Sequence, residues 1–414
     1  MPMSRRACLR TAAVSLGTLL SRSGLSARLF AVDAPKPKHI AAVVTIYRHG
    51  SHADVIVGKI LEGWKQDRGP GPNLKLASLY VDQFPDGDMA RPMAAKYGFP
   101  LCQTIEEAVT LGTNGIPVDG VLSIGEHGDY PTNAKGQKLH PRRRFFEQIT
   151  DTFKKHNKVV PVFNDKHLGP VWSDALWMYE RAQELKVPFM AGSSLPVMYR
   201  NPDPVIPFNE EMEAAVGIGY NGLDVYGFHA LEAYQSIVER RRGGGVGVKW
   251  VECLQGDAVW KAIDAGVIRQ DLFDAAIAQV PRKTPAQIRE LGPSTLFRFE
   301  YLDGFAGAVV MLPTVTETTA VAVKMKQQAQ ILATRFDERS EPRHPHFAFL
   351  LKGLEQMFHT GKPTYPVERT VITSGILDRA LTCLADGEQR MATSELSLRY
   401  QPVDYPHAPL PALS

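Results

Sequence analysis

Side chains that can transfer protons or bind a metal ion follow four apolar runs in the first half of this 414-residue chain. The candidates are His52, Asp82, Glu126, His127, Asp129, Asp165, Lys166 and His167. Imidazole, carboxylate and ammonium groups are the ones that general acid–base catalysis uses. Because such groups recur after successive apolar runs, they predict one functional crevice rather than scattered surface residues.

Lys166 stands between Asp165 and His167 at the end of the fourth run. A lysine that is shielded from water without full burial can give or take a proton near neutral pH. The ordinary alternative is a salt bridge with Asp165. We therefore take Lys166 and Asp165 as candidate catalytic residues and the other crevice residues as candidate pocket residues.

A divalent metal ion is a candidate cofactor at the same place. His127, His167 and Glu126, with Asp129 nearby, supply the nitrogen and oxygen ligands that such an ion accepts. Their spacing matches no metal-binding motif, so the fold would have to bring these ligands together.

Strand-like and helix-like segments alternate from residue 39 to residue 195. Apolar, β-branched runs predict the strands, and amphipathic runs between them predict the helices. Gly98 is expected to end one helix, and Ser173 is expected to cap the start of another. This order predicts a doubly wound parallel sheet, whose strands carry their carboxyl ends, and hence any ligand, at one edge.

Long strands replace this alternation after a proline-rich link that begins near residue 196. The alternating pattern of residues 295–304 is typical of an antiparallel sheet with one covered face. Helical segments follow at residues 347–361 and 368–387. We therefore predict a Rossmann-type domain at residues 35–195 and an α+β domain at residues 196–414.

Residues 1–34 carry a pair of arginines, Arg5 and Arg6, ahead of a short apolar run that Ser and Gly interrupt. This pattern is typical of a twin-arginine export signal, with cleavage expected near Ala34, and it predicts a periplasmic or other extracytoplasmic location. The run is too short to cross a membrane comfortably, so no stable span is expected in the mature chain.

The net charge of +3 comes from that segment, because its five arginines and one aspartate give +4 and leave −1 for the rest. Two basic clusters, 142–144 and 240–242, lack interleaved stacking residues and are expected to be solvated or to contact a local anion. Nucleic acid is therefore not an expected partner. Cys102, Cys253 and Cys383, an odd number without CxxC spacing, predict buried thiols rather than a disulfide framework.

Residues 159–169 resemble the strand that ends in Glu-Lys-Pro in the family of glucose–fructose oxidoreductase, inositol dehydrogenase and rhizopine-catabolism proteins. On that match Asp165 takes the glutamate place, Lys166 the place of the catalytic lysine, and His167 the proline place.

Residues 226–233 are similar to the segment that carries the family's second catalytic histidine, a place that His229 takes. The family usually has an aspartate four residues earlier, where this chain has Val225 and, one residue off, Asp224. Residues 297–312 and 365–381 are similar to a sheet strand and the closing helix of the family's second domain.

This resemblance covers about residues 39–400 and implies a Rossmann domain joined to a domain with an open-faced, mostly antiparallel sheet. It also implies NAD(P), a sugar or cyclitol substrate, and a homo-oligomer that forms through the open face.

The turn after the first run departs from the family's Gly-x-Gly-x-x-Gly pattern. Thr45 and Tyr47 stand where the first two glycines belong, and Gly50 alone remains. The second glycine lets the backbone approach the pyrophosphate, whereas the third serves helix packing. Asp82 keeps the ribose-binding place in outline. We therefore expect a degenerate fingerprint, with ordinary NAD(P) binding lost or strongly altered.

Three functions stay open at this point. In the first, Lys166 and His229 perform acid–base chemistry on a sugar or cyclitol without a nucleotide, with or without a metal ion, as in elimination, hydrolysis or isomerisation. In the second, the chain is an NAD(P)-dependent sugar dehydrogenase with a modified nucleotide site. In the third, it binds a sugar without catalysis.

Overall fold

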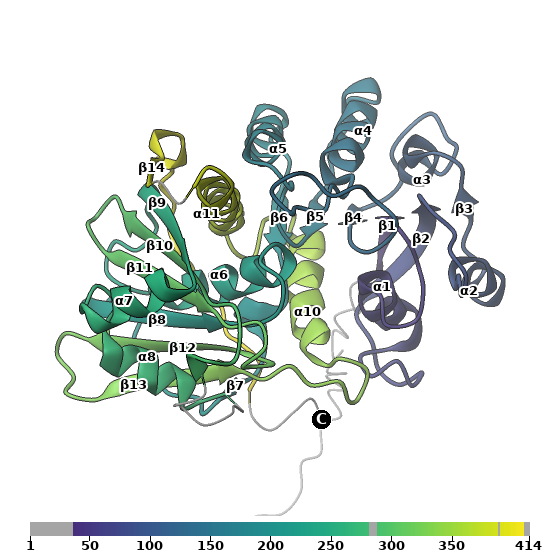
Figure 1. The fold of residues 1–414 in the computed structure, drawn as a ribbon. Helices are drawn as coiled ribbons and strands as arrows, with labels where there is room; N and C mark the ends of the chain where they lie inside the picture. The colour runs from purple at the N-terminus through teal and green to yellow at the C-terminus, as the bar shows by residue number, and fades with distance from the viewer. Residues whose placement is uncertain (1–35, 281–287, 388–389, 410–414) are drawn as a thin grey trace, which may run out of the picture. The chain divides into compact units, whose positions relative to one another are not determined.

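The computed structural model describes residues 36–280, 288–387 and 390–409, so the expected export signal at residues 1–34 lies outside the described residues. From Pro37 the chain forms one compact unit that contains two β-sheets (Figure 1). Within the described residues, no helix is long and apolar enough to cross a membrane.

The first sheet of the described chain has six parallel strands in the order β3-β2-β1-β4-β5-β6. They are β1 (Lys38–Val44), β2 (Leu74–Val81), β3 (Leu101–Cys102), β4 (Gly120–Ile124), β5 (Val162–Asp165) and β6 (Phe189–Gly192). The strand order reverses between β1 and β4, which is the switch point where ligands bind in such sheets. The predicted Rossmann-type sheet is confirmed.

Helices lie on both faces of this sheet because successive side chains of each strand point to opposite sides. The helices are α1 (His52–Glu62), α2 (Ala90–Tyr97), α3 (Ile105–Thr110), α4 (Arg142–Lys155) and α5 (Trp172–Leu185). One apolar core joins α3, α4 and α5 to the sheet, and another joins α1 and α2 to its other face. Gly98 ends α2 in the left-handed conformation, as expected. The prediction for Ser173 is wrong, because α5 begins at Trp172 with Val171 at the N-cap position, two residues earlier, and has no side-chain cap.

Helix α10 (His346–Thr360) comes late in the chain, yet it belongs to the core of the first sheet and lies against α1 (Figure 1). Leu350 and Leu354 are fully buried in that core. Gly120 makes room for Phe358 of this helix, since a Cβ at residue 120 would come within 2.3 Å of the ring. The sequence grouped this helix with the second half of the chain, whereas its apolar face packs on the first sheet.

The second sheet has the order β14-β9-β10-β11-β8-β12-β13-β7 within the described residues. Its strands are β7 (Arg200–Asn201), β8 (Met212–Gly219), β9 (Val248–Gln255), β10 (Thr295–Tyr301), β11 (Ala306–Met311), β12 (Thr319–Met325), β13 (Ile331–Phe336) and β14 (Met391–Ala392). Strands β8 and β11 pair in parallel, and the other neighbouring strands pair antiparallel. The predicted mostly antiparallel sheet is confirmed.

Helices α6 (Val225–Val238) and α11 (Glu368–Ala385) cover one face of the second sheet. On the other face, α7 (Asp257–Asp264) and α8 (Gln270–Ile277) cover the part that carries small apolar side chains (Figure 1). The face expected to be open is therefore open only in part. Its uncovered end at β9 and β10 is polar, and there the guanidinium groups of Arg298 and Arg390 both lie over the ring of Trp250.

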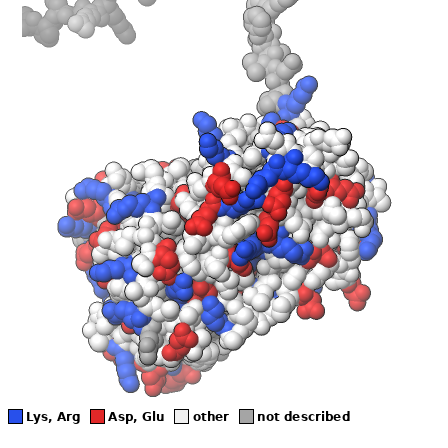
Figure 2. Space-filling model, turned by 90° about the horizontal axis from the view of Figure 1, so that it is seen from above, with Lys and Arg blue, Asp and Glu red and all other residues white. Residues whose placement is uncertain are grey.

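The surface seen in Figure 2 carries basic and acidic side chains of both signs interspersed, without a continuous field of one sign. The cluster at 142–144 is not uniformly solvated, because Arg142 is fully buried and contacts a carboxylate. Arg241 of the second cluster is also buried, pairs with Asp303 and lies over the rings of Tyr301 and Phe305.

Replacing Leu350 with Ala is expected to lower the free energy of unfolding by about 2–5 kcal/mol, because it removes buried methyl groups from the core of the first sheet. Urea denaturation followed by circular dichroism measures the change. Gln356→Ala on the exposed side of the same helix is the matched control and is expected to stay within about 0.5 kcal/mol. Equal effects of the two substitutions would contradict the packing of α10 on the first sheet.

Candidate functional site

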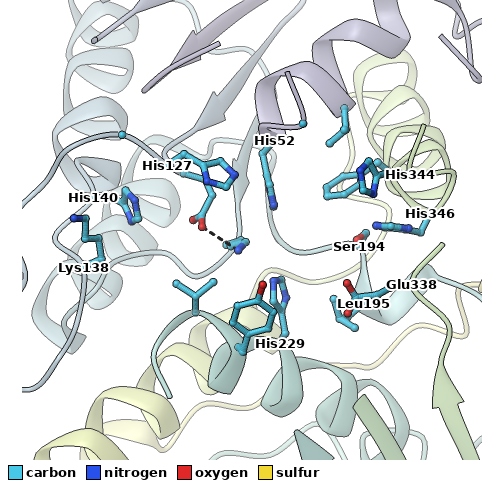
Figure 3. A pocket seen from close by; sticks show the side chains of 18 residues that line it. His52, His127, Lys138, His140, Ser194, Leu195, His229, Glu338, His344 and His346 are labelled. Atoms are coloured by element: carbon cyan, nitrogen blue, oxygen red, sulfur yellow. Dashed lines mark hydrogen bonds and ion pairs between the residues drawn. The ribbon is translucent and has the colours of Figure 1, made fainter. Parts of the chain in front are cut away.

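A cavity of about 440 Å³ opens at the carboxyl edge of the first sheet (Figure 3). All 12 histidines of the chain lie in the described ranges, and six of them line this cavity. The six are His52, His127, His140, His229, His344 and His346. They come from α1, from the loop after β4, from α6 and from the segment that leads into α10, and their rings surround one space in Figure 3.

A chain of charged groups forms one wall of the cavity. The Lys166 Nζ lies 3.0 Å from one oxygen of the Glu126 carboxylate, and Arg142 Nη2 lies 2.6 Å from the other. Arg142 Nη1 is 3.0 Å from Nε2 of His167. These side chains are between 0% and 4% exposed, so the ions stabilise one another with little help from water.

Opposing effects act on the Glu126 carboxyl. Burial would raise its pKa, but the positive charges of Lys166 and Arg142 outweigh burial and hold the pKa well below its usual range. Glu126 is therefore an anion that keeps the two cations in place rather than a proton donor. The Thr45 hydroxyl donates to the Glu126 carbonyl oxygen over 2.5 Å, which ties this residue to the end of β1.

The backbone at the ends of β4 and β5 is bent to present these side chains. His127 and Lys166 have φ values of 66° and 63°, in the left-handed region that side chains other than glycine adopt at a cost. Lys166 holds this conformation because its amide and carbonyl both bond to Gly192, at 3.0 and 3.2 Å. The neighbouring strand therefore fixes the direction of the lysine.

Most cavity histidines are neutral at ordinary pH. The pKa falls to about 4 for His127 and to about 3 for His140 and His346, and burial is the largest cause in each case. Burial also lowers the pKa of His229 well below its ordinary value. A neutral imidazole offers one hydrogen-bond donor and one acceptor. Buried nitrogens of His127, His229 and His346 have no hydrogen-bond partner among the described residues.

His52 is the first residue of α1 and forms a close pair with Asp165 at the end of β5. Its Nδ1 lies 2.7 Å from an Asp165 carboxylate oxygen. The Asp165 side chain is fully buried, while the His52 side chain is 13% exposed at the cavity. The salt bridge that the sequence suggested between Lys166 and Asp165 is not formed, because Lys166 pairs with Glu126 and Asp165 with His52.

The structure brings most of the candidate residues together. Those that line the cavity are Gly50, His52, Glu126, His127, Lys166 and His229. Asp165 and His167 lie immediately behind this wall, in contact with His52 and Arg142 respectively. Asp129 is exposed and lies outside the cavity lining, where its amide bonds to Gln83.

Sequence reasoning missed Arg142, His140, His344 and His346. Arg142 had a usable signal, since it lies three, four and seven residues before Phe145, Phe146 and Ile149, which form the buried face of α4. His344 and His346 gave no such signal in the sequence, because a segment far along the chain brings them to this edge of the sheet.

The turn after β1 and the start of α1 are held by contacts within the protein. In sheets of this kind a pyrophosphate binds at the free amides of the α1 N-terminus. Here Ser51 caps the Asp54 amide, and the Gly50 amide donates to the Asp54 carboxylate over 2.9 Å. Arg343 donates to the same carboxylate over 2.9 Å, and Asp54 is fully buried. The helix end therefore already holds an anion that belongs to the chain.

Two other residues at the expected nucleotide positions, Asp82 and Tyr47, make their contacts within the protein. The Asp82 carboxylate accepts from the hydroxyls of Tyr80 and Tyr130 at 2.8 and 2.7 Å and from Arg144 at 2.7 Å. Tyr47 is fully buried in the apolar core beneath the turn.

Two of the candidate metal ligands bond to protein groups rather than to a common point. His167 bonds to Arg142, and Glu126 is held between the cations of Lys166 and Arg142. Across the described ranges, no three His, Cys, Asp or Glu side chains are grouped in a way that could hold a metal ion.

No protein-family model matches the chain, and no curated protein matches it in sequence. Solved structures are similar to it in fold. GenD2 from gentamicin A biosynthesis, solved in complex with NAD, aligns over 87% of this chain and 97% of its own length, with a TM-score of 0.56 and 12% identity.

Two inositol dehydrogenases are also similar. Myo-inositol 2-dehydrogenase from Lactobacillus plantarum has a TM-score of 0.52 at 11% identity, over 86% of this chain and 99% of its own. Apo scyllo-inositol dehydrogenase from Lactobacillus casei has a TM-score of 0.54 at 8% identity, over 86% and 98%. The likeness shows that this chain has the two-sheet fold of these dehydrogenases.

Replacing Arg142 with Met is expected to destabilise the protein by about 3–5 kcal/mol, because it leaves the buried Glu126 carboxylate with one cation fewer. Chemical denaturation measures the loss. Arg143→Met removes the neighbouring arginine, which pairs with Asp174 near the surface, and should cost at most about 1 kcal/mol. If the two substitutions cost the same, the ion chain at Glu126 does not stabilise the fold as described.

Stability is expected to fall on acidification below pH 6.5. An unfolded histidine binds a proton near pH 6.5, whereas His127 stays neutral down to about pH 4 and His140 to about pH 3. The unfolded state then binds more protons, so the free energy of unfolding decreases from pH 6.5 toward pH 4.

Denaturation midpoints at a series of pH values measure this slope. His140→Gln should flatten it, whereas His39→Gln, at an exposed position, should not change it. A stability that does not vary between pH 6.5 and pH 4.5 would argue against buried neutral histidines.

Proposed function

We propose that this protein is an enzyme that performs acid–base chemistry on a sugar or cyclitol without NAD(P). The observation that carries the proposal is the closed α1 N-terminus beside a formed, histidine-lined cavity. Asp54 and Arg343 occupy the place of a pyrophosphate, while Lys166, Glu126 and the histidines keep a cavity of substrate size.

The catalytic groups in this proposal are those at the wall and floor of the cavity. Lys166 donates hydrogen bonds to an oxygen on which negative charge develops, because Glu126 and the bond to Gly192 hold its side chain in position. His229, on α6, faces it from the second half of the chain and exchanges a proton with the sugar. Asp165 does not line the cavity and acts through His52, with which it pairs.

The substrate class follows from the charge balance of the cavity. Among the residues that line the cavity, Lys138 and Lys166 are matched by Glu126 and Glu338, and the cavity histidines with lowered pKa values are neutral. Neutral imidazoles match sugar hydroxyls, which also donate and accept. An uncharged sugar or cyclitol therefore suits the cavity better than a sugar phosphate.

A second candidate is an NAD(P)-dependent sugar dehydrogenase. It is favoured by the likeness in fold to GenD2, whose structure contains NAD. The protein groups that engage Asp82 and the α1 N-terminus count against it. A metal-assisted form of the first function and a non-catalytic sugar-binding role are the remaining alternatives. Because residues 1–34 have the pattern of a twin-arginine export signal, we propose that any of these activities is performed outside the cytoplasm.

The full chain, incubated in D2O with panels of uncharged aldoses, ketoses, glycosides and inositols, tests the proposal by proton NMR. We expect at least one sugar to change without added nucleotide, and Lys166→Met to slow that change by about 10²-fold or more. A change that requires NAD(P) would establish the dehydrogenase. Saturable binding without any change would leave a sugar-binding protein. A change that a chelator abolishes would assign the metal-assisted form.

A further inference from the structure

We propose that His52 is the catalytic base of this cavity and that Asp165 is its positioning residue. This inference rests on the proposed function and deepens it, because it names the group that removes the proton. It depends on the pair formed by the first residue of α1 and the last residue of β5.

The geometry of the pair fixes which nitrogen can act. His52 Nδ1 lies 2.7 Å from Asp165 Oδ2, so a carboxylate acceptor holds the proton on Nδ1. No described residue bonds to Nε2, and the side chain lines the cavity, where its ring points into the open space in Figure 3. A neutral imidazole held in this way presents its unprotonated Nε2 to a bound molecule.

The surroundings hold this ring in one orientation. Phe347 meets it edge-on at a centroid distance of 5.0 Å, and His127 does so at 5.4 Å. Asp165 is fully buried, and its second oxygen has no hydrogen-bond partner among the described residues. A buried carboxylate with a single partner fixes the orientation and the tautomer of that partner. The same arrangement occurs where an aspartate holds a catalytic histidine.

Lys166 cannot take the same part as readily, because its ammonium group already donates to the Glu126 carboxylate over 3.0 Å. Its position suits it to stabilise negative charge instead. His52 follows β1 and Lys166 follows β5, and both side chains line the same cavity, so base and cation act on one molecule.

The proposed step is a proton transfer that balances without an oxidant. His52 Nε2 takes a proton from a sugar hydroxyl, or from a carbon beside a carbonyl group. The bond to hydrogen breaks, and its electron pair stays on the sugar as an alkoxide or enolate beside Lys166. The Asp165 carboxylate stabilises the imidazolium that forms, and the proton returns to the product.

The tautomer of His52 tests the arrangement without a substrate. Nitrogen-15 NMR of the full chain with labelled histidine, assigned with His52→Gln, should show His52 protonated on Nδ1. In Asp165→Asn the amide can donate to Nδ1, so the proton should move to Nε2. A wild-type His52 that carries its proton on Nε2, or a tautomer that Asp165→Asn leaves unchanged, would overturn the proposal.

Turnover of the sugar found with the NMR panels provides the second readout. His52→Gln and Asp165→Asn should each lower kcat by about 10²-fold or more with little change in KM, and melting curves should show that both remain folded. His49→Gln is the matched control, since His49 is exposed, lies three residues away and does not line the cavity. It should keep the wild-type rate within about threefold.

The two failures differ. If the wild type converts a sugar without nucleotide and His52→Gln converts it equally fast, the base assignment is wrong and the proposed function stands. If the wild type converts no sugar unless NAD(P) is present, the proposed function fails, and the base assignment fails with it.

Discussion

The buried Glu126 carboxylate is the constraint on which the rest of the site depends. A carboxylate that is 4% exposed must be paired, and Lys166 and Arg142 satisfy it from two different elements. To reach it, Lys166 adopts a left-handed backbone conformation at the end of β5, and Arg142 enters the core at the start of α4. The cavity wall is therefore a product of charge pairing as much as of apolar packing.

A second buried carboxylate, Asp54, decides what the adjacent helix end can bind. An α1 N-terminus carries a partial positive charge and free amides, which attract an anion. This chain supplies that anion from its own first turn and neutralises it with Arg343 from the segment before α10. The same segment places His344 and His346 in the cavity, so one stretch of chain both reaches Asp54 and supplies part of the histidine lining.

The first sheet and much of the cavity wall could be predicted from the sequence, because short apolar runs mark parallel strands and their carboxyl ends meet at one edge. That logic led to His52, Glu126, His127 and Lys166. The same logic also led to Asp129, but this residue is exposed and does not line the cavity. The partners of these residues could not be predicted in the same way.

Pairing depends on side-chain reach across the fold, so Lys166 was matched with its neighbour Asp165 rather than with Glu126. The packing of α10 on the first sheet was hidden for a related reason. Its apolar face shows that it is buried, but nothing local says which sheet it covers. His344 and His346 reach the cavity only because that helix returns to α1.

The central proposal is that protein groups fill the nucleotide place of this dinucleotide fold. Its most direct test is to denature the purified full chain, measure released NAD(P) by mass spectrometry, and titrate the folded protein with NAD⁺ and NADPH. The account predicts no released nucleotide and no saturable binding at millimolar concentrations. One nucleotide released per chain, or binding in the micromolar range, would contradict it.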